Sequence, residues 1–300
     1  MPFVFRFFSL LPLWLLHGLG AVMGWVAFIA SPTYRHRFLE NAALAGYRFA
    51  QVRAAVAHAG RMAAEMPRLW LGAAPPCRIV GEEFLLQAHA AGQGTVFLTP
   101  HLGCFEMSAQ AVARRWGAAH GPITVLYRPA RQPWLARVME TARNRPGMQA
   151  VPTTLAGVRQ MIKALRRGEG VGLLPDQVPP EGQGLWAPFF GRNAYTMTLA
   201  ARLAQQTGAT VLLARCERLS WGRGFLLVIE PLPAALDDSL EAAVLQINRA
   251  MEHVIRQCPD QYLWGYARYK QPRAFVRLES LPRGANSKLN RRALRQRGLA

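Results

Sequence analysis

The chain has 300 residues, enough for one sizeable α/β domain or two small ones. Lysine and arginine number 36 against 17 aspartate and glutamate, so the net charge of +19 predicts an acidic partner: nucleic acid, an anionic membrane or a phosphorylated substrate. A composition that is 51% hydrophobic, with 8 Trp and 14 Phe, is rich for a nucleic-acid-binding domain and ordinary for a protein at a bilayer. We therefore favour an anionic membrane and expect no nucleic acid as partner.

The N-terminal segment lacks Lys, Arg, Asp and Glu from Phe7 to Thr33. An apolar helix of about 20 residues spans a bilayer core, and Trp14 and Trp25 suit its interfaces. We predict that residues 1–34 form a membrane anchor helix, which either spans the bilayer or lies in one leaflet. A buried helix of a soluble protein is the alternative. A cleaved signal peptide is disfavoured, because the apolar part is too long and no A-x-A site follows it.

The next segment, residues 35–76, is predicted to be helical, basic and close to the membrane. Helical stretches are expected around 35–45 and 50–72, and Pro75 and Pro76 close the region. At the other end, residues 274–300 are basic and poor in apolar residues. We predict a disordered tail there, and its charges suit anionic headgroups.

Residues 77–273 alternate between strand-like and helical patterns, which predicts an α/β domain with a central mixed, mostly parallel sheet flanked by helices. Strands are expected at 95–99, 123–126, 171–174, 211–215 and 225–229, and helices at about 103–116, 133–144, 154–167, 195–207 and 238–257. Residues 178–193 are rich in Pro and Gly and predict a loop, which either closes over a bound substrate or plugs the edge of the core.

The main chemical signal follows the strand expected at 95–99. Pro100 and His101 come at its carboxyl end, Gly103 permits a tight turn, and a helix is expected to begin near Glu106. A neutral imidazole is a suitable general base for an alcohol near pH 7, and a carboxylate on its other nitrogen would orient it. An H-x-x-x-x-E pattern also arises by chance, so a structural histidine and a helix-capping glutamate remain an alternative.

The chain resembles the lipid A biosynthesis acyltransferases of the lauroyl/myristoyl type, a branch of the lysophospholipid acyltransferase superfamily with a glycerolipid acyltransferase-like fold. The resemblance runs from roughly residue 5 to 273 and rests on ordered blocks. These blocks are GEEFL at 81–85, LTPHLGCFE at 98–106, YRP at 127–129, LLPDQ at 173–177, PFFG at 188–191 and LWGYARYK at 263–270.

The resemblance implies that His101 is the base and Glu106 its partner. It also implies a set of substrate-binding residues, some of them for phosphate: Arg128, Arg143, Arg145, Asp176, Gln177, Phe190, Gly191, Arg268 and Lys270. Arginine suits phosphate because its planar donors bind two oxygens at once. For a single arginine the alternative is a surface charge, and for Asp176 and Gln177 it is an ordinary turn after a strand.

By the same resemblance, the expected reaction moves a fatty acyl group from an acyl thioester to a hydroxyl of a phosphorylated glycolipid such as a lipid A precursor. The expected thioester donor is acyl-carrier protein. The acyl-carrier protein places the reaction on the cytoplasmic side of a bacterial inner membrane. No cofactor and no metal are expected, since the seven histidines lack metal spacing. The cysteines form no C-x-x-C pair and are expected to be free thiols in a reducing compartment.

Two positions depart from the family pattern. Cys104 and Phe105 precede Glu106 where many relatives have Asn with Trp or Phe, and Tyr266 replaces the usual His. An acyl-cysteine on Cys104 is disfavoured, because donor and acceptor can react directly. The Tyr266 difference keeps open an acyltransferase that acts on a lysophospholipid or another glycolipid with acyl-CoA. A more remote alternative is a non-enzymatic basic protein that binds membranes or nucleic acid.

Overall fold

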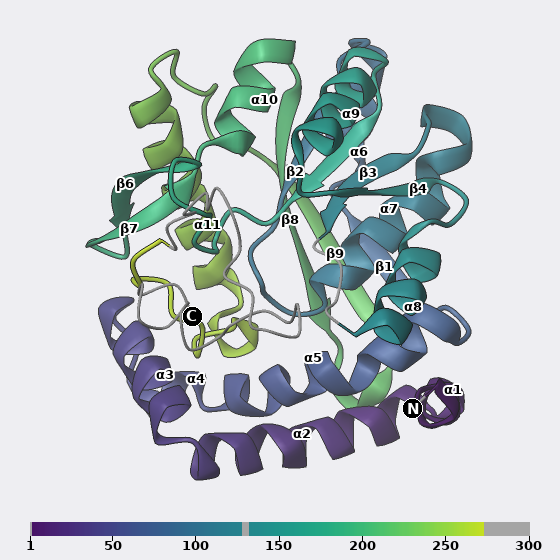
Figure 1. Ribbon diagram of the computed structural model, residues 1–300, viewed down its shortest axis with the longest axis vertical. Helices are drawn as coiled ribbons and strands as arrows, with labels where there is room; N and C mark the ends of the chain where they lie inside the picture. The colour runs from purple at the N-terminus through teal and green to yellow at the C-terminus, as the bar shows by residue number, and fades with distance from the viewer. Residues whose placement is uncertain (1, 128–131, 273–300) are drawn as a thin grey trace, which may run out of the picture.

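The computed structural model describes residues 2–127 and 132–272, and its architecture is shown in Figure 1. Arg128 and the predicted tail therefore lie outside the described residues. The centre is a seven-stranded sheet with the order β1-β9-β8-β2-β5-β3-β4. Its strands are β1 (Cys77–Val80), β2 (Thr95–Leu98), β3 (Ile123–Tyr127), β4 (Met148–Pro152), β5 (Gly170–Leu173), β8 (Thr210–Arg218) and β9 (Phe225–Pro231). Only the β8–β9 pair is antiparallel, so the predicted mixed, mostly parallel sheet is confirmed.

Helices cover both faces of the sheet, as predicted. One face carries α6 (Glu82–Ala90), α7 (Phe105–His120) and α8 (Pro133–Arg143), and the other carries α9 (Leu155–Arg166), α10 (Leu199–Thr207) and α11 (Leu240–Gln257). In β2 every residue is buried. Val96 and Leu98 join the apolar cluster on one face and Phe97 joins the other. Such an unbroken apolar run is typical of a strand that is covered on both sides.

Two of the central strands end together. Leu98, the last residue of β2, pairs in parallel register with Leu173, the last residue of β5. In each case the chain continues through a proline two residues later, Pro100 and Pro175. The segments that follow these strands are therefore delivered to the same carboxyl edge of the sheet, which is where open α/β folds place their sites.

The expectation of a loop at 178–193 is wrong, because most of its second half is a β-hairpin. β6 (Gly184–Phe189) pairs antiparallel with β7 (Arg192–Met197), so α10 begins at Leu199 and not near residue 195. Pro188 hides this strand from a sequence reading, although a two-stranded ribbon tolerates proline at an edge. Phe190 and Gly191 form its turn with φ of 47° and 77°, as a two-residue turn of type I′ requires.

Five N-terminal helices form a further layer, at the bottom of Figure 1. They are α1 (Pro2–Leu10), α2 (Leu13–Ala30), α3 (Pro32–Leu44), α4 (Phe49–Val52) and α5 (Ala54–Leu71). Pro12 divides the single helix predicted for residues 1–34, because proline is restricted to the first turn or cap of a helix. In the part of the chain that the structure describes, α2 alone is long and apolar enough to cross a membrane.

The α2 helix lies along α5 in a contact made by glycines. Gly20 and Gly24, one turn apart on α2, face Gly60 of α5. A Cβ on Gly60 would overlap the carbonyl oxygen of Gly20, and a Cβ on Gly24 would overlap that of Val56. Small residues spaced in this way allow two helix backbones to approach closely.

A buried ion pair joins this layer to the sheet. Glu65 of α5 is fully buried and accepts hydrogen bonds from the Arg218 guanidinium at the end of β8, the shortest at 2.6 Å. His17 of α2 lies 3.0 Å from the same carboxylate. Burial alone would raise the pKa of Glu65, but the charge of Arg218 and the hydrogen bonds from His17 and Arg218 lower it to about 2. α2, α5 and the sheet are thus fastened by one charged cluster.

We predict that Gly60→Ala destabilises the protein by about 2 kcal/mol, because the added methyl group forces α2 away from α5. The matched control is Gly18→Ala on α2, where a Cβ meets no atom within 4 Å; it should stabilise the helix by up to about 1 kcal/mol. Thermal unfolding of both variants in detergent measures the difference. Equal melting temperatures for the two variants would contradict a close glycine contact.

Candidate active site

His101 lies in the turn after β2, at the carboxyl edge of the sheet. Its Nδ1 is 2.7 Å from Oδ1 of Asp176, and its backbone N–H donates to Oδ2 of the same carboxylate at 2.9 Å. On the opposite side of the ring, the amide nitrogen of Gln177 lies 3.0 Å from Nε2. Both Asp176 and Gln177 follow β5, the parallel neighbour of β2. Three of the predicted site residues are therefore brought together.

The Asp176 carboxylate sets the protonation pattern of the His101 ring. Burial alone would raise the pKa of Asp176, but the charge and hydrogen bonds of His101 outweigh it and hold that pKa below its ordinary value. An ionised carboxylate only accepts hydrogen bonds, so Nδ1 of His101 carries a proton. In the neutral ring Nε2 then holds a lone pair, to which Gln177 donates. A substrate hydroxyl that displaces Gln177 would meet a basic nitrogen.

Glu106 forms its hydrogen bonds with Trp70 and Arg143, whereas the resemblance implied His101 as its partner. Its Oε1 accepts from the indole N–H of Trp70 and from Nε of Arg143, both at 3.0 Å, and its Oε2 accepts from Nη2 of Arg143 at 2.7 Å. Glu106 stands in the first turn of α7 and is directed toward α5 and α8, whereas Asp176 reaches His101 from the neighbouring strand. The observed contacts thus give Glu106 the task of joining three helices.

Two of the predicted phosphate-binding arginines, Arg143 and Arg145, have hydrogen-bond partners at or near Glu106 on α7, whereas Arg128 lies outside the described residues. The guanidinium of Arg143 is bidentate to Glu106 and lies 5.7 Å from the ring centroid of Trp70. Arg145 donates to the backbone oxygen of Trp70 and, at 3.4 Å, to Gln110. Both side chains are occupied by protein groups, so a contact with phosphate stays a prediction for them.

Backbone hydrogen bonds hold the His101 turn from the side of the C-terminal segment. The carbonyl oxygen of His101 accepts from the N–H of Leu263 at 3.1 Å, and the N–H of Gly103 donates to Gln261 at 3.0 Å, in the short helix η2 (Pro259–Gln261). Gly103 has φ of 55°, and a Cβ there would overlap the carbonyl oxygen of Cys216. The predicted tight turn is confirmed, and it needs glycine.

Tyr266, which stands where the family pattern has histidine, has a structural partner. Its hydroxyl accepts a hydrogen bond from the backbone N–H of Val178 at 3.0 Å. It thereby holds the loop that begins with Asp176 and Gln177. The predicted substrate contact Lys270 is exposed, and its Nζ lies 4.9 Å from the ring centroid of Tyr266.

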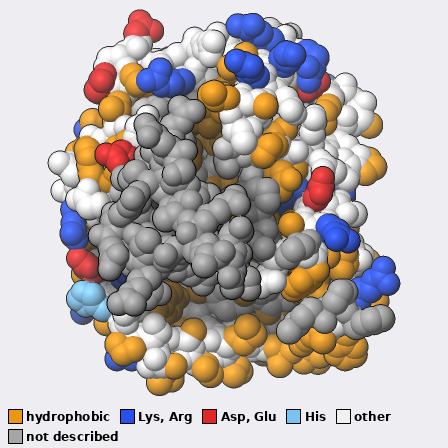
Figure 2. Space-filling model, viewed as in Figure 1, with side chains coloured by type: hydrophobic (Ala, Val, Ile, Leu, Met, Phe, Trp, Pro, Cys, Tyr) orange, Lys and Arg blue, Asp and Glu red, His pale blue; other side chains and the backbone are white. Residues whose placement is uncertain are grey.

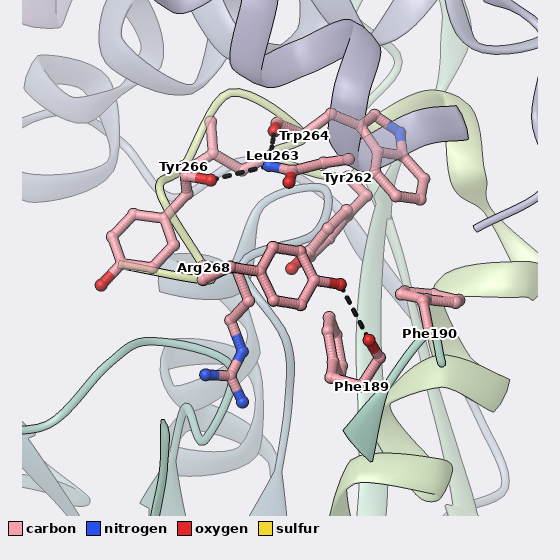
Figure 3. Close-up of a pocket in the computed structure, with 9 residues that line it drawn as sticks. Phe189, Phe190, Tyr262, Leu263, Trp264, Tyr266 and Arg268 are labelled. Carbon is pink, nitrogen blue, oxygen red and sulfur yellow. Dashed lines mark hydrogen bonds between the residues drawn. The ribbon is translucent and has the colours of Figure 1, made fainter. Parts of the chain in front are cut away.

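A small pocket beside the site is lined by residues of the β6–β7 hairpin and of the C-terminal segment (Figure 3). Arg268 is buried there and donates to the backbone oxygen of Tyr195 at 2.7 Å and to Thr196 Oγ1 at 2.6 Å, both on β7. Its guanidinium also lies 4.9 Å from the ring centroid of Phe189. These contacts hold the hairpin, and the contact of Arg268 with substrate stays a prediction.

The hairpin turn itself faces the same pocket. The Phe190 ring is buried, with its centroid 6.0 Å from that of Trp264, and its backbone N–H donates to Glu252 at 2.7 Å. Gly191 is exposed, at the tip of the turn. A non-glycine residue with positive φ costs about 1 kcal/mol, which the burial of the Phe190 ring offsets.

A comparison with known protein families identifies the family of this chain. A sequence profile for the bacterial lipid A biosynthesis acyltransferases matches residues 3–271. The chain belongs to this family. The family resemblance predicted from the sequence is thus confirmed. Three of the blocks that carry it, at 98–106, 173–177 and 263–270, meet at the His101 turn.

Curated relatives of the chain include lipid A acyltransferases from two bacteria. It is 28% identical over 195 residues to the lipid A biosynthesis lauroyltransferase of Escherichia coli strain K12, covering 64% of this chain and 61% of the relative. The palmitoleoyltransferase of the same strain is 27% identical over the same shares. A lipid A biosynthesis acyltransferase of Haemophilus influenzae is 25% identical over 62% of this chain and 56% of the relative. The matches thus span about three fifths of those relatives.

Cys104, which departs from the family pattern, is a poor nucleophile. Its side chain is completely buried, and burial raises the pKa of its thiol well above the ordinary value. The thiolate is the reactive form of cysteine, so this position lacks the acidity that covalent catalysis requires. An acyl-cysteine at Cys104 is therefore disfavoured on the structure as well.

We predict that Glu106→Gln lowers the free energy of unfolding by about 2–3 kcal/mol, because it leaves Arg143 with a neutral partner in a largely buried position. The matched control is Glu169→Gln, whose partner Arg167 is largely exposed; this change should cost less than about 1 kcal/mol. Thermal unfolding compares the two. A loss for Glu106→Gln no larger than that of the control would argue against the three-helix role.

Proposed function

We propose that this protein is an O-acyltransferase that moves a fatty acyl group from an acyl thioester to a hydroxyl of a lipid A precursor, with His101 as general base. The observation that carries the proposal is the His101–Asp176 pair at the carboxyl edge of the sheet. Asp176 in our proposal takes the orienting role that the sequence assigned to Glu106. Glu106 then supports the site through Arg143 and Trp70.

The reaction follows from the protonation pattern of the pair. The acceptor hydroxyl takes the place of the Gln177 amide at Nε2 of His101 and gives its proton to that nitrogen as its oxygen attacks the thioester carbonyl. The Asp176 carboxylate stabilises the imidazolium that forms and remains ionised. When the tetrahedral intermediate collapses, the C–S bond breaks. The leaving thiolate takes the proton from His101, which restores the neutral ring.

The proposed donor is acyl-carrier protein, with acyl-CoA as the alternative. Carrier proteins are acidic, and the chain has a net charge of +19. Complementary charge speeds encounter and selects partners more than it adds to final affinity. The curated relatives, named as lauroyl and palmitoleoyl transferases, differ in the acyl group that they transfer. We therefore assign no chain length to this protein.

The proposed acceptor is a phosphorylated glycolipid, and Arg128, Arg143 and Arg145 remain the proposed phosphate contacts. Arg143 bonds to Glu106 and Arg145 bonds to Gln110, one turn further along α7, so both guanidinium groups lie against this helix. A substrate phosphate would add a further acceptor for these guanidinium groups. We place the reaction at the cytoplasmic side of a bacterial inner membrane, where carrier thioesters are made.

The test is acyl transfer from radiolabelled acyl-carrier protein to a lipid A precursor in detergent. We expect activity in the native protein and a loss of a hundredfold or more in His101→Ala and Asp176→Asn, because the first removes the base and the second removes its orienting charge. Asp237→Asn is the matched control, since Asp237 is exposed and caps a surface turn. It should retain full activity.

The outcomes separate mechanism from substrate. If the native protein is active and Asp176→Asn matches it, the proposed role of Asp176 is wrong while the reaction class stands. If the native protein is inactive on this pair but active with acyl-CoA or a lysophospholipid, the acceptor or donor assignment is wrong. Inactivity with every thioester and lipid pair would contradict the acyltransferase proposal itself.

A further inference from the structure

The layer of N-terminal helices exposes large apolar side chains on the surface of the protein. Six such side chains lie on α1, on α2 and on the turn between β8 and β9, and we call them the lipid face: Leu10, Trp14, Val22, Val26, Ile29 and Trp221. Figure 2 shows hydrophobic side chains along the lower edge, where Figure 1 places α2. Contiguous apolar surface of this kind marks an interaction site.

Trp221 extends the lipid face beyond α2. It lies in the short helix η1 (Ser220–Gly222), whose glycine touches the α2 backbone at Leu13 and Trp14. Its side chain is 88% exposed and its φ is 58°, a conformation that costs a non-glycine residue about 1–2 kcal/mol. An indole this exposed gains little from packing against the described residues, so such packing does not offset that cost. A membrane interface, where tryptophan is favoured, would offset it.

The attachments of α2 are incompatible with a helix that crosses the bilayer. α2 packs along α5 through Gly20, Gly24 and Gly60, and its His17 bonds to Glu65 in the cluster with Arg218. If α2 crossed with these contacts intact, α5 and the edge of the sheet would lie in hydrocarbon, where charged groups are costly. If α2 left α5, Glu65 would lose one of its partners and the glycine faces would open.

The charge around the lipid face suits an anionic leaflet. The first acidic residue of the chain is Glu40, so α1 and α2 carry none. Arg6 and Arg37 are exposed at the two ends of this stretch. A basic residue beside an anionic surface contributes about 1 kcal/mol of attraction, and a rim of them keeps a helix at headgroup level.

We propose that α2 lies in the plane of the membrane, with the lipid face inserted into one leaflet of an anionic bilayer, and that both ends of α2 are on the same side. At about 1.5 Å per residue the helix is long enough to span, so its attachment to α5 and not its length decides the outcome. This inference concerns membrane topology and stands or falls apart from the proposed acyl transfer.

The first test reads topology from two variants that each add one exposed cysteine, Arg6→Cys and His36→Cys. Both carry Cys77→Ser, and the three native cysteines that remain are buried. The full chain is treated with a membrane-impermeant maleimide in spheroplasts and in inverted membrane vesicles. We expect both positions to label from the same, cytoplasmic side. Labelling of the two positions from opposite sides would overturn the proposal.

The second test measures insertion with purified full chain in vesicles of phosphatidylethanolamine and phosphatidylglycerol that contain brominated acyl chains. We compare tryptophan quenching in Trp221→Phe with that in Trp186→Phe, a half-exposed position on β6 away from α2. We expect the brominated lipid to quench Trp221 but not Trp186. The fraction of tryptophan fluorescence that is quenched should therefore fall in Trp221→Phe and rise in Trp186→Phe. Equal quenching of both, or no quenching of Trp221, would overturn the insertion.

Discussion

The parallel pairing of β2 with β5 is the constraint on which the site depends. Leu98 and Leu173 end these strands in register, and His101 and Asp176 each follow three residues later. Parallel neighbours deliver their carboxyl ends to one edge of a sheet, so the ring and the carboxylate meet at 2.7 Å although 75 residues separate them in the chain. A shift of one residue in this register would turn the following side chains to the opposite face.

The residues around the His101–Asp176 pair connect the neighbouring helices and loops to one another. Glu106 ties α7 to α5 and α8 through Trp70 and Arg143, and Tyr266 holds the loop after Gln177. The Glu65–Arg218 cluster attaches the same α5 to the sheet and, through His17, to α2. α5 therefore contacts α2 through Gly60 and the proposed site through Trp70, so it connects the proposed lipid face to the His101 edge of the sheet.

Much of this arrangement is predictable from the sequence. Apolar runs between helical patterns predict the mixed, mostly parallel sheet, and the position of His101 after one such run predicts its place at the edge. Asp176 also follows an apolar run, which predicts its place at the carboxyl edge of the sheet. Its bond to His101 is not predictable, because spacing in the sequence does not show which strands are neighbours. The β6–β7 hairpin was hidden by Pro188, and the partners of Glu106 were hidden because Trp70 and Arg143 come from distant helices. Contacts of this kind depend on tertiary packing, which local patterns do not encode.

The central claim is that Asp176 holds His101 as a base with its lone pair on Nε2. Nitrogen NMR of histidine-labelled protein near neutral pH tests it most directly, with the His101 signals assigned by their loss in His101→Gln. The account predicts a protonated Nδ1 and an unprotonated Nε2 in the native protein, and a loss of this preference in Asp176→Asn. A native ring protonated on Nε2, or a tautomer unchanged in Asp176→Asn, would contradict it.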